Sequence, residues 1–263
     1  MADDRSVVLV TGGARRIGRA IVLDLAAQGH DLAVHYRGSA DEAQRVVSEA
    51  RELGAQAEAF GADLDDEAAC RALLPAVVAR FGRADAVINN ASGFEYDDAA
   101  GFNFERLQRL MRSNCGAPVL LAQALHEHLK PRQAQGCVVN LLDQKLWNPN
   151  PDYFSYTLSK AALESATTML AMALAPLLRV CAVAPGVTLL SGPMDDEEFR
   201  RAHRLTPLQR SSTPEDVARS VRFLLQSPAI TGTTLLVDGG QHLAGQARDV
   251  LFLARDVALS TRP

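Results

Sequence analysis

The sequence is poor in the residues from which metal centres and disulfide frameworks are built. It has four cysteines among 263 residues, and no two of them form a C-x-x-C pair. They are Cys70, Cys115, Cys137 and Cys181. This spacing gives neither a thiolate zinc cage nor a disulfide-stapled fold. We expect buried free thiols and no bound metal.

Long apolar runs and a strong excess of one charge are also missing. The longest apolar stretches, such as Met169–Leu178, are broken by proline and too short to cross a bilayer. A net charge of -4 provides no basic face for nucleic acid. The first residues lack the basic start and apolar stretch of a secretory signal. These absences predict a cytoplasmic protein with a small-molecule partner, and neither membrane nor nucleic-acid binding.

Short β-branched segments alternate with longer segments of helical periodicity along the chain. This order predicts an α/β protein with a single-domain Rossmann fold over residues 1–263, in which a doubly wound seven-stranded parallel sheet has helices on both faces. The predicted strands are Ser6–Val10, Asp31–Tyr36, Ala55–Phe60, Ala86–Asn89, Cys137–Leu141, Arg179–Val183 and Thr234–Val237. The predicted helices are Arg16–Gln28, Ala40–Leu53, Asp66–Phe81, Phe104–Leu129 as one helix or two, Tyr153–Leu177 and Pro214–Leu225.

Two segments lie outside this alternation. The insert 188–213 is the longest irregular stretch, and we interpret it as a substrate lid or as a surface excursion with a short helix. It ends at a helix start, where Ser212 or Thr213 can cap and Pro214 fits the first turn. The tail 241–263 carries apolar runs at Val250–Ala254 and Val257–Leu259, which we expect to pack on a neighbouring subunit.

The segment Thr11–Gly18 leaves a strand and opens a helix, so its backbone N–H groups and the helix N-terminus meet at one point. This context predicts a pyrophosphate site. Arg16 stands where many dinucleotide loops have a second glycine, and we expect it to contact phosphate or substrate. The cofactor contacts predicted in this loop are Thr11, Gly12, Arg16, Ile17 and Gly18.

The end of the second predicted strand indicates which nicotinamide cofactor binds. An NAD site would offer an acidic side chain to the ribose hydroxyls there. The sequence instead has Tyr36, Arg37 and Ser39, and Arg37 with Ser39 can hold a 2′-phosphate through charge-assisted hydrogen bonds. We therefore expect NADP(H). Asp63, after the third strand, is predicted either to contact adenine or to cap the following helix.

A second set of polar residues follows the fifth predicted strand. Tyr156 and Lys160 stand four apart on a predicted helix and so share a face. Asp143 lies thirteen residues before Tyr156, at the carboxyl end of that strand. Active sites of open α/β sheets gather at this edge, so we expect the three side chains to meet there.

These features resemble the short-chain dehydrogenase/reductase family from Thr11 to Gly240. The matching segments are Thr11–Gly18, Asn89–Ser92, Asn114, Tyr156 with Lys160, Pro185–Thr188 and Val237–Gly240. The resemblance implies that the tyrosine is the general acid, that the lysine lowers its pKa and binds ribose, and that the asparagine supports a water relay. It implies further cofactor contacts at Asn90, Ala91, Ser92, Lys160, Pro185, Gly186 and Thr188, and a homotetramer.

Most of that family has serine where this sequence has Asp143. An ionised aspartate only accepts hydrogen bonds and would repel a forming alkoxide, whereas it suits a substrate edge rich in N–H donors. A protonated Asp143, or one turned away from the site, is the alternative. With Arg16, Tyr156 and Lys160, this aspartate resembles the pteridine reductase branch, including dihydromonapterin and dihydrofolate reductases. There Phe94 would stack on the pterin, although it can also be an ordinary packed aromatic.

The expected function is NADPH-dependent hydride transfer to a C=N bond of a pterin or dihydrofolate-like substrate. Tyr156 would protonate the neighbouring nitrogen, with Asp143, Lys160 and Asn114 as the other catalytic residues. The predicted substrate contacts are Arg16, Ser92, Phe94, Asp143 and Tyr156. Two alternatives stay open, namely reduction of a carbonyl such as a 3-oxoacyl thioester, and a non-catalytic NADP(H)-binding sensor.

Overall fold

A single parallel sheet forms the centre of the molecule. The computed structural model describes residues 5–190 and 194–254. In these residues seven strands pair in parallel in the order β3-β2-β1-β4-β5-β6-β7, which confirms the predicted fold class. The strands are β1 Val7–Val10, β2 Asp31–Tyr36, β3 Ala57–Gly61, β4 Ala86–Asn89, β5 Gly136–Leu141, β6 Leu178–Pro185 and β7 Thr234–Val237.

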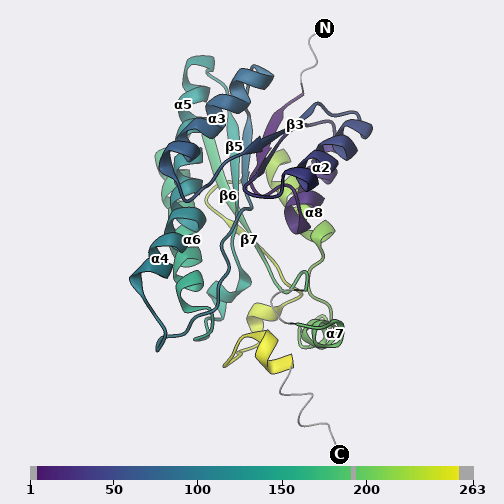
Figure 1. Ribbon diagram of the computed structural model, residues 1–263, viewed down its shortest axis with the longest axis vertical. Coiled ribbons are helices and arrows are strands. Elements are labelled where there is room, and N and C mark those ends of the chain that lie inside the picture. Colours follow the sequence, from purple (N-terminus) through teal and green to yellow (C-terminus); the bar gives the residue numbers. More distant parts are fainter. Residues whose placement is uncertain (1–4, 191–193, 255–263) are drawn as a thin grey trace, which may run out of the picture.

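Helices cover both faces of the sheet, as Figure 1 shows. One layer consists of α1 Arg16–Ala27, α2 Ala40–Glu52 and α8 Pro214–Gln226, and the other of α3 Glu67–Phe81, α4 Phe104–Met111, α5 Ala117–Leu129 and α6 Phe154–Ala173. In β1, Val8 and Val10 belong to the core of the first layer, while Val7 and Leu9 belong to that of the second. Because both faces are buried, the central strands are apolar at consecutive positions.

Local chemistry sets the helix boundaries. Thr213 caps α8 in a capping box with Asp216, and Pro214 occupies the first turn, as predicted. The helix predicted to reach Leu177 ends at Ala173, because Pro176 has no N–H and disfavours the helical conformation in the residue before it. The stretch predicted as one helix or two contains α4 and α5, joined by a π-helical turn at Arg112–Gly116.

The insert 188–213 contains a short helix, α7 Asp196–Arg204, capped by the Asp195 carboxylate. Beside it lie residues 250–254, a helical segment of the tail, and both are seen at one end of the sheet in Figure 1. Val250, Leu251 and Ala254 form a small apolar core with Met194 and Ala202 of the insert. This part of the tail therefore packs on its own chain. The run Val257–Leu259 lies outside the described residues.

The order of the strands creates a crevice at their carboxyl ends. β1 lies between β2 and β4, so the connections from β1 and β4 leave the sheet toward opposite faces. The polar segments that follow β1, β2, β4 and β5 all meet at this edge.

Within the described ranges, no helix has the length and apolar character needed to span a membrane.

Candidate active site

A cavity of about 410 Å³ lies at the carboxyl ends of β1, β2 and β4. Nine of the predicted cofactor contacts line it, namely Gly12, Arg16, Ile17, Gly18, Arg37, Asp63, Asn90, Ala91 and Ser92. We call it the cofactor cavity. Arg15, Arg109 and Glu95 also line it, and the sequence analysis did not single them out. Its position at the reversal of strand order is where doubly wound folds bind dinucleotides.

Thr11 and Asn90 hold the glycine-rich loop against β4. The Thr11 hydroxyl accepts hydrogen bonds from the backbone N–H groups of Asn90 and Ala91, both at 3.0 Å. The Asn90 amide donates to the carbonyl oxygens of Thr11 at 2.9 Å and Gly12 at 3.1 Å. A Cβ on Gly18 would lie 2.1 Å from the Gly12 oxygen, so only glycine allows this close approach. Thr11 is therefore not a lining residue of the cofactor cavity, but its hydrogen bonds hold the residues that line it.

His35 completes this support, and sequence reasoning missed its role. Its Nδ1 accepts a hydrogen bond from the Gly12 N–H at 3.1 Å, and Nε2 lies 3.1 Å from the Ala62 carbonyl oxygen. Burial lowers the pKa of His35, which favours the neutral ring that this pair of contacts requires. The signal available in the sequence was a histidine inside an otherwise apolar strand.

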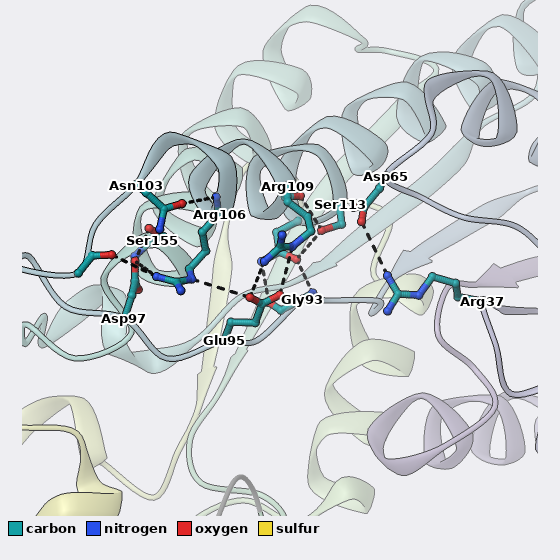
Figure 2. A network of polar contacts seen from close by, with 12 residues as sticks. Arg37, Asp65, Gly93, Glu95, Asp97, Asn103, Arg106, Arg109, Ser113 and Ser155 are labelled. Carbon is teal, nitrogen blue, oxygen red and sulfur yellow. Dashed lines mark hydrogen bonds and ion pairs between the residues drawn. The ribbon is translucent and has the colours of Figure 1, made fainter.

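Of the residues predicted at the 2′-phosphate, only Arg37 lines the cofactor cavity. Arg37 lines the cofactor cavity and forms an ion pair with Asp65 at 3.7 Å, as Figure 2 shows. Tyr36 and Ser39 are not among the cavity-lining residues; the Tyr36 ring packs against Gly61, and Ser39 precedes α2. The alternative that Asp63 caps α3 is wrong, because Asp66 holds that position and accepts from Ala68 N–H.

A second cavity of about 540 Å³ adjoins the first and shares Arg16, Ile17 and Ser92 with it. We call it the substrate cavity. The predicted site residues that line it also include Phe94, Asp143, Tyr156, Pro185, Gly186 and Thr188. Residues of the insert and of the tail form its outer wall, namely Leu189, Leu190, Met194, Asp249, Val250 and Leu251.

Asp143 and Tyr156 form a hydrogen-bonded pair in the substrate cavity. The Tyr156 hydroxyl donates to Asp143 Oδ2 at 3.0 Å, and the Lys145 backbone N–H donates to Oδ1 at 2.9 Å. Asp143 is therefore not turned away from the site. Burial raises the pKa of Asp143. Burial and the neighbouring Asp143 carboxyl raise the pKa of Tyr156 well above its ordinary value, so the phenol is a neutral proton donor.

Lys160 lies beneath this pair and is almost fully buried. Its ammonium donates to the Leu141 carbonyl oxygen at 2.7 Å and lies 5.8 Å from the centre of the Tyr156 ring. Burial lowers the pKa of Lys160 to about 8. The expected lowering of the tyrosine pKa by this lysine is wrong here, because burial and Asp143 raise that pKa. Neither Lys160 nor Asn114 is among the cavity-lining residues.

Asn114 lies in the π-helical turn between α4 and α5. Its Oδ1 accepts from the Gly93 N–H at 2.7 Å, and its Nδ2 donates to the Gly93 carbonyl oxygen at 3.0 Å and to Ser159 Oγ at 2.9 Å. Ser159 in turn donates to the Tyr156 carbonyl oxygen. Asn114 therefore holds the segment after β4 against the helix that carries Tyr156, and no hydrogen bond joins it to Lys160 among those of the described residues.

Phe94 is half exposed at the mouth of the substrate cavity. One face stacks on the Tyr153 ring, with centres 4.3 Å apart and planes at 17°. The edge contact with Tyr156 has centres 4.8 Å apart. The segment that carries Phe94 is fixed by ion pairs and hydrogen bonds, shown in Figure 2: Glu95 pairs with Arg109 at 2.6 Å, and buried Asp97 accepts from Ser155.

Comparison with known proteins places this geometry in a family. A sequence profile described as "Enoyl-(Acyl carrier protein) reductase" matches residues 12–242. A 3-oxoacyl-(acyl-carrier-protein) reductase, FabG of Staphylococcus aureus, is 33% identical over 251 residues, which cover 89% of this chain and 97% of the relative. The chain belongs to the short-chain dehydrogenase/reductase family.

Solved structures of the short-chain dehydrogenase/reductase family include close matches. FolM alternative dihydrofolate reductase 1 from Brucella canis, complexed with NADP, is 40% identical with a TM-score of 0.86, covering 93% of this chain and 97% of that one. The Brucella suis protein, also in complex with NADP, is 40% identical with a TM-score of 0.85, covering 93% of this chain and 98% of that one. The sequence comparison and the structure comparison thus name relatives of two different reductase types.

Proposed function

We propose that this protein is an NADPH-dependent reductase that transfers hydride to a C=N bond of a pterin or dihydrofolate-like substrate. The observation that carries the proposal is the hydrogen bond between Asp143 and Tyr156, 3.0 Å long, in the wall of the substrate cavity. It joins a carboxyl group of raised pKa to a neutral phenol. Such a pair can deliver a proton next to a donor-rich ring.

The cofactor cavity has the residues that NADP(H) needs. The close contact of Gly12 and Gly18 leaves backbone N–H groups at the start of α1 free to approach a pyrophosphate, with Arg16 beside them. Arg37 would hold the 2′-phosphate in exchange for its ion pair with Asp65. Bound NADPH supplies the hydride. The two FolM proteins at 40% identity, crystallised with NADP, support this cofactor.

The substrate cavity suits a flat ring with N–H donors. Phe94 lies at its mouth, and Tyr153 supports one face of that aromatic ring. Asp143 offers carboxyl oxygens that accept N–H groups from a ring edge. The Tyr156 hydroxyl then gives its proton to the ring nitrogen beside the carbon that receives hydride, and the phenolate takes up a new proton from solvent. A fixed ring plane brings the reacting atoms into a productive geometry.

Reduction of a 3-oxoacyl thioester is the second candidate, because FabG is 33% identical over most of the chain. In that reaction a carbonyl oxygen gains negative charge as hydride arrives. An ionised Asp143 within reach of that oxygen would repel it, whereas a serine hydroxyl would donate to it. Asp143 therefore favours the pterin over the thioester.

The test is NADPH oxidation by the purified protein with dihydrobiopterin, dihydromonapterin, dihydrofolate and an acetoacetyl thioester, repeated with Asp143→Ser. We expect turnover of one or more pterins or of dihydrofolate, and about a hundredfold loss of that activity in the variant, by analogy with removal of one polar group at a transition state. Thioester reduction alone, or faster turnover by Asp143→Ser, would contradict the proposal. Binding of NADPH without any turnover would indicate a sensor.

A further inference from the structure

A charged side chain that the sequence analysis did not single out lies in the wall of the substrate cavity. Lys145 is only 3% exposed and belongs to the short 3-10 turn Gln144–Trp147, directly after Asp143. A lysine buried to this degree must find a partner, because removing an ammonium from water is strongly unfavourable. Its contacts therefore show what the surrounding structure maintains.

Lys145 touches both features on which substrate binding depends. Its backbone N–H donates to Asp143 Oδ1 at 2.9 Å. Its ammonium lies 5.5 Å from the centre of the Tyr153 ring, and that ring is the one stacked on Phe94. Lys145 thus contacts the Asp143 carboxyl group through its backbone and the stacked Tyr153 and Phe94 rings through its side chain.

The partner of the buried ammonium comes from the C-terminal tail. Lys145 Nζ donates to Asp249 Oδ2 at 3.1 Å, although the two residues are 104 positions apart. The backbone N–H of Asp249 donates to Asp152 Oδ2 at 2.8 Å, and the Arg248 guanidinium pairs with the same carboxylate at 2.9 Å. The tail is therefore attached to the loop between Asp143 and Tyr156 at Lys145, at Asp152 and also at Asn148, which donates to the Ala244 carbonyl oxygen and accepts from the Gln246 N–H.

The Lys145–Asp249 and Arg248–Asp152 ion pairs differ in one respect that matters for function. Lys145 and Asp249 both line the substrate cavity, whereas Arg248 and Asp152 are not among its lining residues. The Arg248 side chain is also 46% exposed to solvent. An apolar side chain at position 145 could pack behind Tyr153 without needing a charged partner. A buried ion pair instead ties its two segments together, because moving them apart would leave an uncompensated buried charge.

We propose that Lys145, held by Asp249, is a positioning residue that sets the relative placement of Asp143 and Phe94, so that the C-terminal tail helps to determine substrate affinity. The proposal rests on the proposed function only in the choice of a pterin as the assay substrate. The expected signature is a change in KM with little change in kcat, because the backbone N–H of Lys145 continues to hold Asp143 in these variants and Asp143 stays bonded to Tyr156, whereas the Tyr153 and Phe94 rings lose their support.

The first experiment compares Lys145→Met, Lys145→Arg, Asp249→Asn and Arg248→Met with the wild-type enzyme, using NADPH and the best pterin. We expect Lys145→Met and Asp249→Asn to raise KM about tenfold and to leave kcat within about threefold. Lys145→Arg keeps the charge and should restore KM to within about threefold. Arg248→Met removes the other ion pair, keeps the Asp249 N–H bond to Asp152, and should leave KM within about twofold of wild type, as the matched control.

Two kinetic outcomes would overturn the proposal. One is a wild-type KM in both Lys145→Met and Asp249→Asn. The other is an equal rise in KM for Arg248→Met, which would mean that any loosening of the tail has the same effect. Using two variants of the pair keeps the test valid if one of them does not fold.

A second readout needs no substrate. Trp147, the one tryptophan of the chain, lies on the same short turn as Lys145 and is 40% exposed. Its emission should shift to longer wavelength in Lys145→Met and stay unchanged in Arg248→Met; an unshifted spectrum in Lys145→Met would count against the proposal. If the wild-type enzyme reduces only the thioester, the proposed function is wrong. The role of Lys145 can then still be tested, by measuring KM for the thioester and the Trp147 emission in the same variants.

Discussion

The cofactor cavity and the substrate cavity adjoin each other but are built in different ways. The cofactor cavity is lined mainly by short segments that directly follow β1, β2, β3 and β4. The substrate cavity combines the segment after β5 with α6, the insert and the C-terminal tail. Parallel strands bring the first set to one edge as a consequence of the fold. The second set meets only because long connections return to that edge.

Asp143 of the substrate cavity differs from the paired acids of the cofactor cavity as well. In the cofactor cavity, Asp65 pairs with Arg37 and Glu95 pairs with Arg109, so each of these acids has a guanidinium partner. In the substrate cavity, Asp143 accepts hydrogen bonds only from the neutral Tyr156 hydroxyl and the Lys145 backbone N–H, among the contacts of the described residues. An acid with neutral partners and a raised pKa takes up a proton more readily. The first cavity thus suits binding of a charged cofactor and the second suits proton transfer.

The largest expected effect separates chemistry from cofactor binding. Tyr156→Phe removes the proton-donating hydroxyl, which bonds to Asp143 of the substrate cavity, and keeps the ring that packs with Leu110 of the cofactor cavity. We expect kcat with the best substrate to fall by about 10²–10⁴-fold, the usual contribution of a general acid. The Kd for NADPH, followed by nicotinamide fluorescence, should remain within about twofold. A kcat within tenfold of wild type would mean that the proton comes from another group.

A smaller effect should be confined to the cofactor cavity. Arg37→Ala removes the guanidinium assigned to the 2′-phosphate, and a lost charge-assisted hydrogen bond weakens binding by about tenfold. We expect the Kd for NADPH to rise by that factor while the Kd for NADH stays unchanged. The control is Arg19→Ala. Arg19 lies on α1, the helix that follows the glycine-rich loop, and the substitution removes its surface ion pair with Glu49 of α2. Equal weakening of both cofactors would show that Arg37 does not read the 2′-phosphate.

The smallest expected effect is a pH dependence that involves both cavities. Lys160 is charged below its pKa, and burial lowers that pKa to about 8, so the ammonium is lost as the pH rises through this value. If the charge is needed for ribose binding and for the field at Tyr156, kcat/KM at pH 8 should be about half of its value at pH 7. The measurement is a kcat/KM profile from pH 6 to 9. A flat profile across this range would show that the charge is dispensable.

The fold was largely predictable because its signals are local. Central strands such as Val7–Val10 are apolar at consecutive positions, as a strand buried on both faces requires. The start of α8 was readable from Thr213 and Pro214, since a capping side chain acts within one turn. The predicted end of the helix at Leu177 was wrong because the apolar pattern continues past Ala173, while Pro176 breaks the backbone.

By itself, the sequence determined the elements at the crevice and which polar groups each carries there. Asp143, Tyr156 and Arg37 could be named because they follow strands or share a helical face, both properties of local geometry. Only the tertiary structure decided how these groups are paired: that Asp143 bonds to Tyr156, that the Phe94 ring rests on Tyr153, and that Lys145 meets Asp249 across 104 positions. Burial then raised or lowered the pKa values, because desolvation depends on neighbours that the order of residues does not name.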